Sequence, residues 1–234
     1  MPEGVTVNKR LAVFIDLGIM EYKRALELQI KTLGSRIDQT LSQDRIFFVE
    51  HPPVFTLGKR GGEENLTVSR EFLASRGIDL VQTDRGGNIT YHGPGQSVLY
   101  PIVDLEAKRM GVKDFVWGLE EIMKQTALDF NIKADRNSLN HGLWVGNAKI
   151  GSVGLSIKKG ISFHGLAMNI NLDLEPFSWM NPCGLSHISV TSVQKEMQKA
   201  GKPLAEPAMN QVKAAFKKHF ASVLNYDISE RHES

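Results

Sequence analysis

Cysteine is scarce in this chain, since Cys183 is the only one among 234 residues. One thiol excludes an internal disulfide framework. The sequence also lacks any run close to the roughly 20 apolar residues that a membrane-spanning helix needs. Its N-terminus, MPEGVTVNKR, has no apolar segment of the kind found in secretion signals. We therefore expect a protein of the reducing cytoplasm.

The chain also lacks an excess of charge of either sign. Lys and Arg number 28 against 26 Asp and Glu, which gives a net charge of +2. That balance does not indicate nucleic-acid binding. Basic residues cluster only locally, at 158–159 and 213–218, where they fit either a solvated face or a patch that steers an acidic partner protein. The histidines and the single cysteine form neither a CxxC nor an HExxH motif, so we expect no metal site.

Apolar periodicity predicts three main helices, at 21–41, 113–130 and 207–224. Short apolar runs at 46–49 and 54–57 predict strands, separated by a His-Pro-Pro sequence that cannot continue a ladder. We expect one α+β domain over 1–234, with a mixed, largely antiparallel sheet flanked by helices and a frayed polar tail at 227–234. A β-hairpin is expected in the middle, from Leu143 to Ile157 around Gly146-Asn147, followed by a third strand from Phe163.

Cys183 lies between a proline and a glycine, which indicates a turn. A thiol on a turn can present its sulfur to a ligand. The alternative is a buried cysteine that acts as a small hydrophobe, as most free cysteines do.

Strand alternation places Lys149 in phase with Gly151, Val153, Leu155 and Ile157. The lysine would then share an apolar face, which lowers the pKa of its amine and favours proton transfer near neutral pH. The alternative is that the side chain, close to a turn, extends to solvent.

The segment RGGNITYHGPGQ at 85–96 holds four glycines and a proline. This composition favours a loop whose backbone approaches a ligand closely or adopts positive φ, although a decorated hairpin turn has similar content. Its spacing matches neither a Walker loop nor a dinucleotide fingerprint. Further on, His164 is in phase with Leu166 and Met168, which predicts a ring on the apolar face, as a core or a functional histidine.

Together these segments resemble the octanoyltransferases of lipoate biosynthesis, also called lipoate-protein ligase B. The resemblance spans about 51–193, and the matching stretches are HPPVFTLG (51–58), RGGNITYHGPGQ (85–96) with its continuation to Asp104-Leu105, GLWV (142–145), KIGSVG (149–154), FHGLAMN (163–169) and PCGL (182–185). Small departures, at Gly151-Ser152 and Leu185, affect details of the acyl pocket only.

The resemblance implies transfer of an octanoyl group from octanoyl-acyl carrier protein to a lysine of lipoyl domains, in 2-oxo acid dehydrogenase complexes and the glycine cleavage H protein. Its fold is shared with biotin protein ligases and ATP-dependent lipoate ligases. The family's nucleophile, which carries the acyl group as a thioester, falls on Cys183, and its partner falls on Lys149, with a supporting role open for His164. The implied acyl-binding positions are Arg85, Gly86, Gly87, Asn88, Ile89, Thr90, Tyr91, His92, Ser152, Val153, Gly154, Gly165, Leu166 and Ala167.

Two other functions compete with this one. An ATP-dependent lipoate ligase would activate a free acid as an adenylate, and a non-catalytic adaptor would only bind the acyl carrier. The thioester route needs no cofactor, and we expect a monomer.

Overall fold

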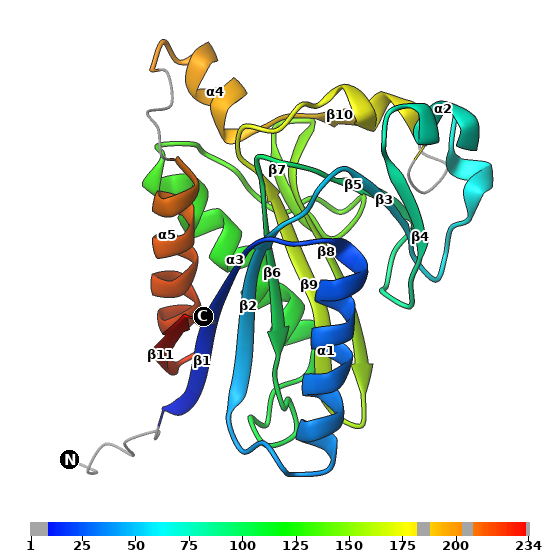
Figure 1. Cartoon of the computed structure of the whole chain (residues 1–234). Helices are drawn as coiled ribbons and strands as arrows, with labels where there is room; N and C mark the ends of the chain where they lie inside the picture. The colour runs from blue at the N-terminus through cyan, green and yellow to red at the C-terminus, as the bar shows by residue number, and fades with distance from the viewer. Residues whose placement is uncertain (1–8, 182–187, 203–207, 233–234) are drawn as a thin grey trace.

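A computed structural model describes residues 9–181, 188–202 and 208–232. These residues form an eight-stranded sheet in the order β10-β8-β9-β6-β2-β1-β11, with β7 also paired to β8 (Figure 1). Its centre is antiparallel, whereas β1 runs parallel to β2 and β11, and β10 runs parallel to β8. The predicted mixed, largely antiparallel α+β architecture is confirmed. The strands are β1 (Arg10–Ile19), β2 (Asp44–Glu50), β6 (Gln96–Ile102), β7 (Gly142–Val145), β8 (Ala148–Lys158), β9 (Ile161–Asn169), β10 (Ser189–Val190) and β11 (Tyr226–His232).

A smaller sheet stands beside the large one, in the order β4-β3-β5. It consists of β3 (Val54–Leu57), β4 (Asp79–Gln82) and β5 (Ile89–His92), and it packs with α2 (Arg70–Ser75) and the 3₁₀ helix η2 (Glu175–Trp179). Another short 3₁₀ helix, η1 (Glu63–Asn65), precedes α2 and buries none of its residues. Pro52 and Pro53 cannot donate to a ladder. The chain leaves the large sheet at this point, so the two predicted strands exist but belong to different sheets.

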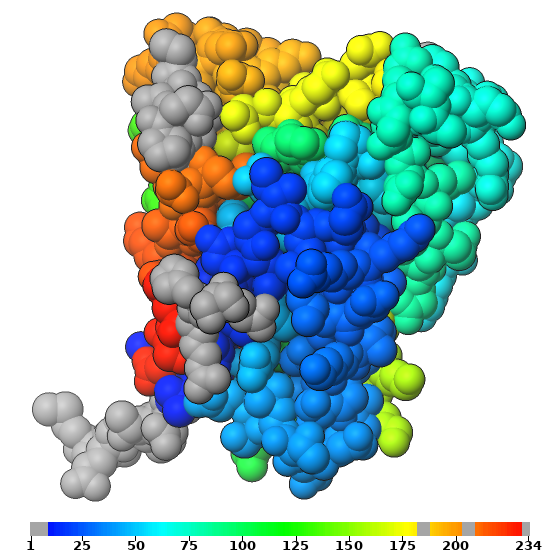
Figure 2. All heavy atoms as spheres, viewed as in Figure 1, coloured from blue at the N-terminus to red at the C-terminus, as the bar shows by residue number. Residues whose placement is uncertain are grey.

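Helices cover both faces of the large sheet. α1 (Tyr22–Ile37) packs on one face, over β9 and β6, and lies in front in Figure 2. α3 (Val112–Asp129) and α5 (Ala208–Val223) pack together on the other, while α4 (Val193–Lys199) follows β10. All three predicted main helices are confirmed, α1 ending earlier than expected. Within the described ranges, no helix is both long and apolar enough to cross a membrane.

Strand alternation divides the core into two layers. Phe48, Leu99 and Leu166 point toward α3 and α5, whereas Phe47 and Val98 point toward α1. Because successive side chains of a strand alternate between the two faces of the sheet, residues adjacent in sequence pack in different layers of the core.

The expectation of a frayed tail at 227–234 is wrong for residues 227–232. They form β11, which pairs in parallel with β1, from Arg10 opposite Tyr226 to Asp16 opposite His232. Tyr226 is buried and its hydroxyl donates to Asp44 at 2.8 Å, and Ile228 packs on the core. The expectation was wrong because the tail is mostly polar in sequence, whereas two apolar side chains on the same face are enough to pack an edge strand against the core. β1 itself, with no turn signal around it, was not predicted.

Candidate active site

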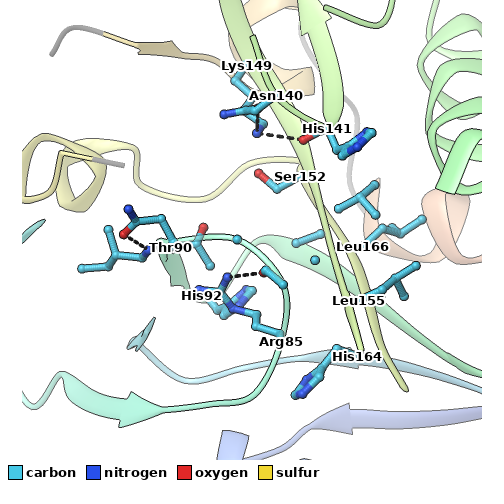
Figure 3. Close-up of a pocket in the computed structure, with 18 of the residues that line it drawn as sticks. Arg85, Thr90, His92, Asn140, His141, Lys149, Ser152, Leu155, His164 and Leu166 are labelled. Carbon is cyan, nitrogen blue, oxygen red and sulfur yellow. Dashed lines mark hydrogen bonds between the residues drawn. The ribbon is translucent and has the colours of Figure 1, made fainter. Parts of the chain in front are cut away.

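A cavity of about 880 Å³ lies between the large sheet and the loop that connects β4 to β5. Its lining includes Lys149 and His164, together with residues 85–90, His92, 152–155 and 165–167. Figure 3 shows Lys149 at one end, Ser152 and Leu166 along the wall, and His164 at the other end. Segments far apart in sequence are therefore brought together around one cavity.

Among the predicted site residues that the structure describes, Tyr91 is the one outside this lining. Tyr91 packs into the core of the small sheet, with its ring 5.2 Å from that of Phe55 and 5.7 Å from that of Phe177. Strand alternation explains this, since Thr90 and His92 face the cavity and Tyr91 points away. Cys183 lies outside the described residues. Met180 and Ile188, on either side of the segment 182–187, both line the cavity.

The loop at 85–88 forms one wall, and its backbone ties the small sheet to β8. Gly58 and Arg60 donate their amides to the carbonyls of Asn88 and Gly87, and Gly86 donates to the carbonyl of Leu155 at 2.8 Å. A Cβ on Gly86 would come within 3.0 Å of the Leu155 oxygen. The close approach that glycine permits here is therefore between two stretches of the protein's own backbone.

Arg85 is buried within this wall. Its guanidinium donates to Thr56 Oγ1 at 3.0 Å, to the Thr56 carbonyl at 2.6 Å and to the Gly86 carbonyl at 3.1 Å. Because these bonds fix the planar fork, Arg85 holds the loop in place against β3.

The regular alternation assumed for Lys149 is interrupted. Trp144 pairs with Lys149 and Leu143 pairs with Gly151, so Ile150 is an extra residue on β8. This β-bulge reverses the side-chain phase. Gly151 faces α3, where a Cβ would lie 2.6 Å from Met123 Sδ, whereas Lys149 lines the cavity with Ser152. The prediction that Lys149 shares the face of Gly151 is therefore wrong, because no sequence pattern marks the bulge.

The Lys149 amine donates to Asn140 Oδ1 and to the carbonyl of His141, the latter at 3.0 Å (Figure 3). The buried carboxylate of Glu120 in α3 positions this segment, since it accepts the Gly142 amide at 2.9 Å and lies 3.2 Å from His141 Nδ1. Sequence reasoning missed Glu120, which sits unremarkably in a helix.

His164 marks the opposite end. Its backbone has a φ of 56°, a left-handed conformation unusual for a residue with a side chain. Its amide donates to Gln29 Oε1 of α1 at 2.8 Å, and its Nε2 lies 2.8 Å from Asp84 Oδ1. The ring contacts Phe163, with centroids 4.8 Å apart, rather than following Leu166 and Met168 into the α3 layer. Its predicted phase is wrong, because the positive φ redirects the side chain.

Four more buried rings surround this end: Tyr22, His51, His92 and Tyr100. His51 bonds the Met20 carbonyl at 2.7 Å and the Tyr100 hydroxyl at 2.8 Å. Burial lowers the pKa of His51 to about 4, and burial together with the nearby His51 lowers the pKa of His92 to about 3. Burial also raises the pKa of Tyr22 to about 12 and lowers that of His164, against the effect of Asp84. All these rings are therefore uncharged at neutral pH.

Comparison of the sequence and the fold with those of known proteins identifies the family of this chain. The family model described as the lipoyl protein ligase A/B catalytic domain matches residues 21–221. The chain belongs to this family. Among curated relatives, the octanoyltransferase of Desulfotalea psychrophila is 49% identical over 80% of this chain and 84% of its own. That of Alkaliphilus metalliredigens is 42% identical over 92% and 96%.

Solved structures of lipoyl protein ligases share the fold. A lipoate-protein ligase A bound with ATP aligns with a TM-score of 0.73 at 17% identity, covering 97% of this chain and 90% of that one. A bipartite lipoate protein ligase from Thermoplasma acidophilum, studied with its E2 lipoyl domain, gives 0.72 at 17% identity over 96% and 88%. A biotin protein ligase from Leishmania major in complex with biotin gives 0.55 at 10% identity over 91% and 73%.

In this lipoyl protein ligase A/B domain, the cavity has Lys149 at one end and neutral rings, His92 among them, at the other. Small residues, Gly154 and Ala167 among them, leave room along the sheet, and one amine stands at the end beside Asn140. Among the described side chains, no three His, Cys, Asp or Glu residues are grouped as a metal ion would require.

Proposed function

We propose that the protein transfers an octanoyl group from octanoyl-acyl carrier protein to a specific lysine of lipoyl domains, with Cys183 as the acyl carrier. Two curated relatives, 42% and 49% identical, are named octanoyltransferases, which supports octanoyl as the group that is transferred. The lipoyl acceptor is supported by the family itself and by the E2 lipoyl domain studied with one structural neighbour.

The observation that favours this mechanism is the position of Lys149 beside the chain that follows the cysteine segment. Val190 of β10 pairs with Lys149, and the Thr191 amide donates to the Lys149 carbonyl at 2.9 Å. Met180 and Ile188, which flank residues 182–187, line the same cavity.

In the first half-reaction, the Cys183 thiolate attacks the thioester carbonyl carbon. A new C–S bond forms, the bond to the carrier's sulfur breaks, and the departing thiolate takes a proton from the Lys149 ammonium. An unperturbed thiol has a pKa of about 8.5, so a neighbouring amine that accepts its proton raises the reactive fraction at neutral pH.

In the second half-reaction, the lipoyl-domain lysine attacks the Cys183 thioester. The C–N bond forms as the C–S bond breaks, and the proton lost by the incoming amine passes to Lys149 or to the cysteine sulfur. The thioester already stores the energy of the amide, so no nucleotide enters either step.

Intact-mass spectrometry tests the proposal directly. Incubation with octanoyl-acyl carrier protein, without ATP, should add one octanoyl group to the protein, and a lipoyl domain added afterwards should remove it. Cys183→Ser should abolish both events. An adduct that persists in this variant would contradict the cysteine route, and transfer only from octanoate with ATP would favour the adenylating ligase. Mass photometry or light scattering would test the expected monomer.

A further inference from the structure

The cavity is longer than the chain it is proposed to hold. His164 pairs with Leu155, six residues along β8 from Lys149. At about 3.3 Å per residue, and allowing for the bulge, the two ends are roughly 17 to 20 Å apart. Seven carbon–carbon bonds of about 1.5 Å give an octanoyl chain a length below about 11 Å. A chain attached near Lys149 therefore ends before it reaches His164.

Beyond that point the lining becomes polar, and two of its atoms have no partner. His164 Nδ1 and Tyr22 Oη are buried and make no hydrogen bond with any described residue. The Thr83 side chain lowers the pKa of Tyr22 as a hydrogen-bonding neighbour does, but the Thr83 hydroxyl donates its own proton to the Leu57 carbonyl at 3.0 Å. Buried polar atoms are satisfied in nearly all proteins, so this pair indicates a ligand group or an ordered water.

The two atoms belong to one cluster of rings. Tyr22 lies edge-on to His51 with centroids 5.2 Å apart, His51 is 5.8 Å from Tyr100, and Tyr100 is 6.5 Å from His164. Asp84, which bonds His164, also acts electrostatically on Tyr22. The inner end of the cavity is thus a single polar compartment.

Hydrogen-bonding roles in this compartment are fixed by the neighbours. A carboxylate only accepts, so His164 donates its Nε2 proton to Asp84, and the neutral ring offers Nδ1 as an acceptor. Tyr22 remains protonated and donates. A hydroxyl group is complementary to both, because it donates to Nδ1 and accepts from the phenol. A methyl group matches neither, and a carboxylate does not match Nδ1.

We propose that Tyr22 and His164 form a hydroxyl-binding subsite, through which the protein binds and transfers acyl chains of about twelve carbons with a terminal hydroxyl group. With an octanoyl chain bound, water occupies the subsite. A longer unsubstituted chain displaces this water without replacing its hydrogen bonds, which disfavours it. The transfer part of this inference rests on the proposed function.

The test compares three acyl-carrier thioesters, octanoyl, dodecanoyl and 12-hydroxydodecanoyl, with a lipoyl domain as acceptor. Wild type should transfer the 12-hydroxydodecanoyl group with a kcat/KM about 10-fold above dodecanoyl, because unpaired polar groups reject the analogue that lacks the hydroxyl. Tyr22→Phe should bring that ratio close to one. Tyr226→Phe, whose hydroxyl bonds Asp44 on the edge strand, should keep the wild-type ratio.

Calorimetry with free dodecanoate and 12-hydroxydodecanoate gives a readout that needs no turnover. Wild type should bind the hydroxy acid about 10-fold more tightly, and both Tyr22→Phe and His164→Leu, checked for folding by thermal melts, should lose this preference. Equal affinity in wild type, or a preference retained in a folded Tyr22→Phe variant, would overturn the subsite. If binding discriminates but no thioester, octanoyl included, is transferred, the proposed function fails while the subsite stands.

Discussion

The two ends of the cavity are built in opposite ways. At one end a charged amine is held by loop groups, the Asn140 side chain and the His141 carbonyl, and a bulge directs it inward. At the other, uncharged rings pack around each other, and burial keeps His51 and His92 neutral. The proposed proton transfer takes place at the first end, which contributes little to the core, whereas the second end is part of the core itself. Substitutions at the two ends should therefore separate activity from stability.

The largest effect is expected for activity at the lysine end. Lys149→Ala should lower octanoyl transfer about 10²- to 10⁴-fold, the range typical for loss of a general acid–base group, with little change in thermal stability. Steady-state transfer to a lipoyl domain and a thermal melt provide the two measurements. Lys158→Ala, an exposed position on the same strand, is the matched control and should retain activity. A Lys149→Ala protein with a lowered melting temperature and a normal rate of octanoyl transfer would contradict the assignment of activity to this end of the cavity.

Substitutions in the wall near His164 should lower the free energy of unfolding. A Cβ on Gly165 of β9 would overlap the carbonyl oxygen of Leu99 on the neighbouring strand β6. Since backbone has to move, Gly165→Ala should cost about 3 kcal/mol of unfolding free energy. Gly34 in α1 has open space around it and no positive φ, so Gly34→Ala should instead add up to about 1 kcal/mol. Urea denaturation measures both, and equal effects would show that Gly165 is not tightly packed.

A smaller effect is expected from pH. The folded-state pKa of His92, about 3, lies below the unfolded value near 6.5. The unfolded state therefore binds more protons between these values, and stability is full above pH 6.5 and falls as the pH drops toward 3. Between pH 7.5 and 5, His92 should account for a loss of about 2 kcal/mol.

Urea denaturation of His92→Gln at the two pH values checks this contribution, since the variant should lose less stability on acidification. His141→Gln, at the exposed lysine end, should lose as much as wild type. If both variants follow the wild-type curve, His92 is not held neutral by the fold.

Much of the fold was predictable because it depends on local pattern. Apolar periodicity predicted α1, α3 and α5, and the dipeptide Gly146-Asn147 predicted the turn between β7 and β8. The segments that line the cavity were found through resemblance, which already reflects tertiary structure. Tyr91 was assigned to the cavity with its neighbours, whereas strand alternation turns it away.

The failures have a common physical origin in single backbone residues. Ile150 shifts the register and moves Lys149 to the other face, and His164 adopts a positive φ that redirects its ring. Neither residue type signals such a conformation, because β-sheet neighbours from distant segments impose it. The inner ring cluster was missed for a similar reason, since Tyr22 and Tyr100 become neighbours only after α1 packs on β6.

The pairing of β1 with β11 has a consequence for how the protein is made. Arg10 leaves the ribosome well before its partner Tyr226, because nearly all the other described residues lie between them in the sequence. Until then β1 can pair with β2 on one side only, and its other edge is open to pairing with another chain. Contacts between such distant residues also form slowly, because a long loop has to close first. The outer edge of β1 therefore stays open during synthesis until the segment that forms β11 has been made.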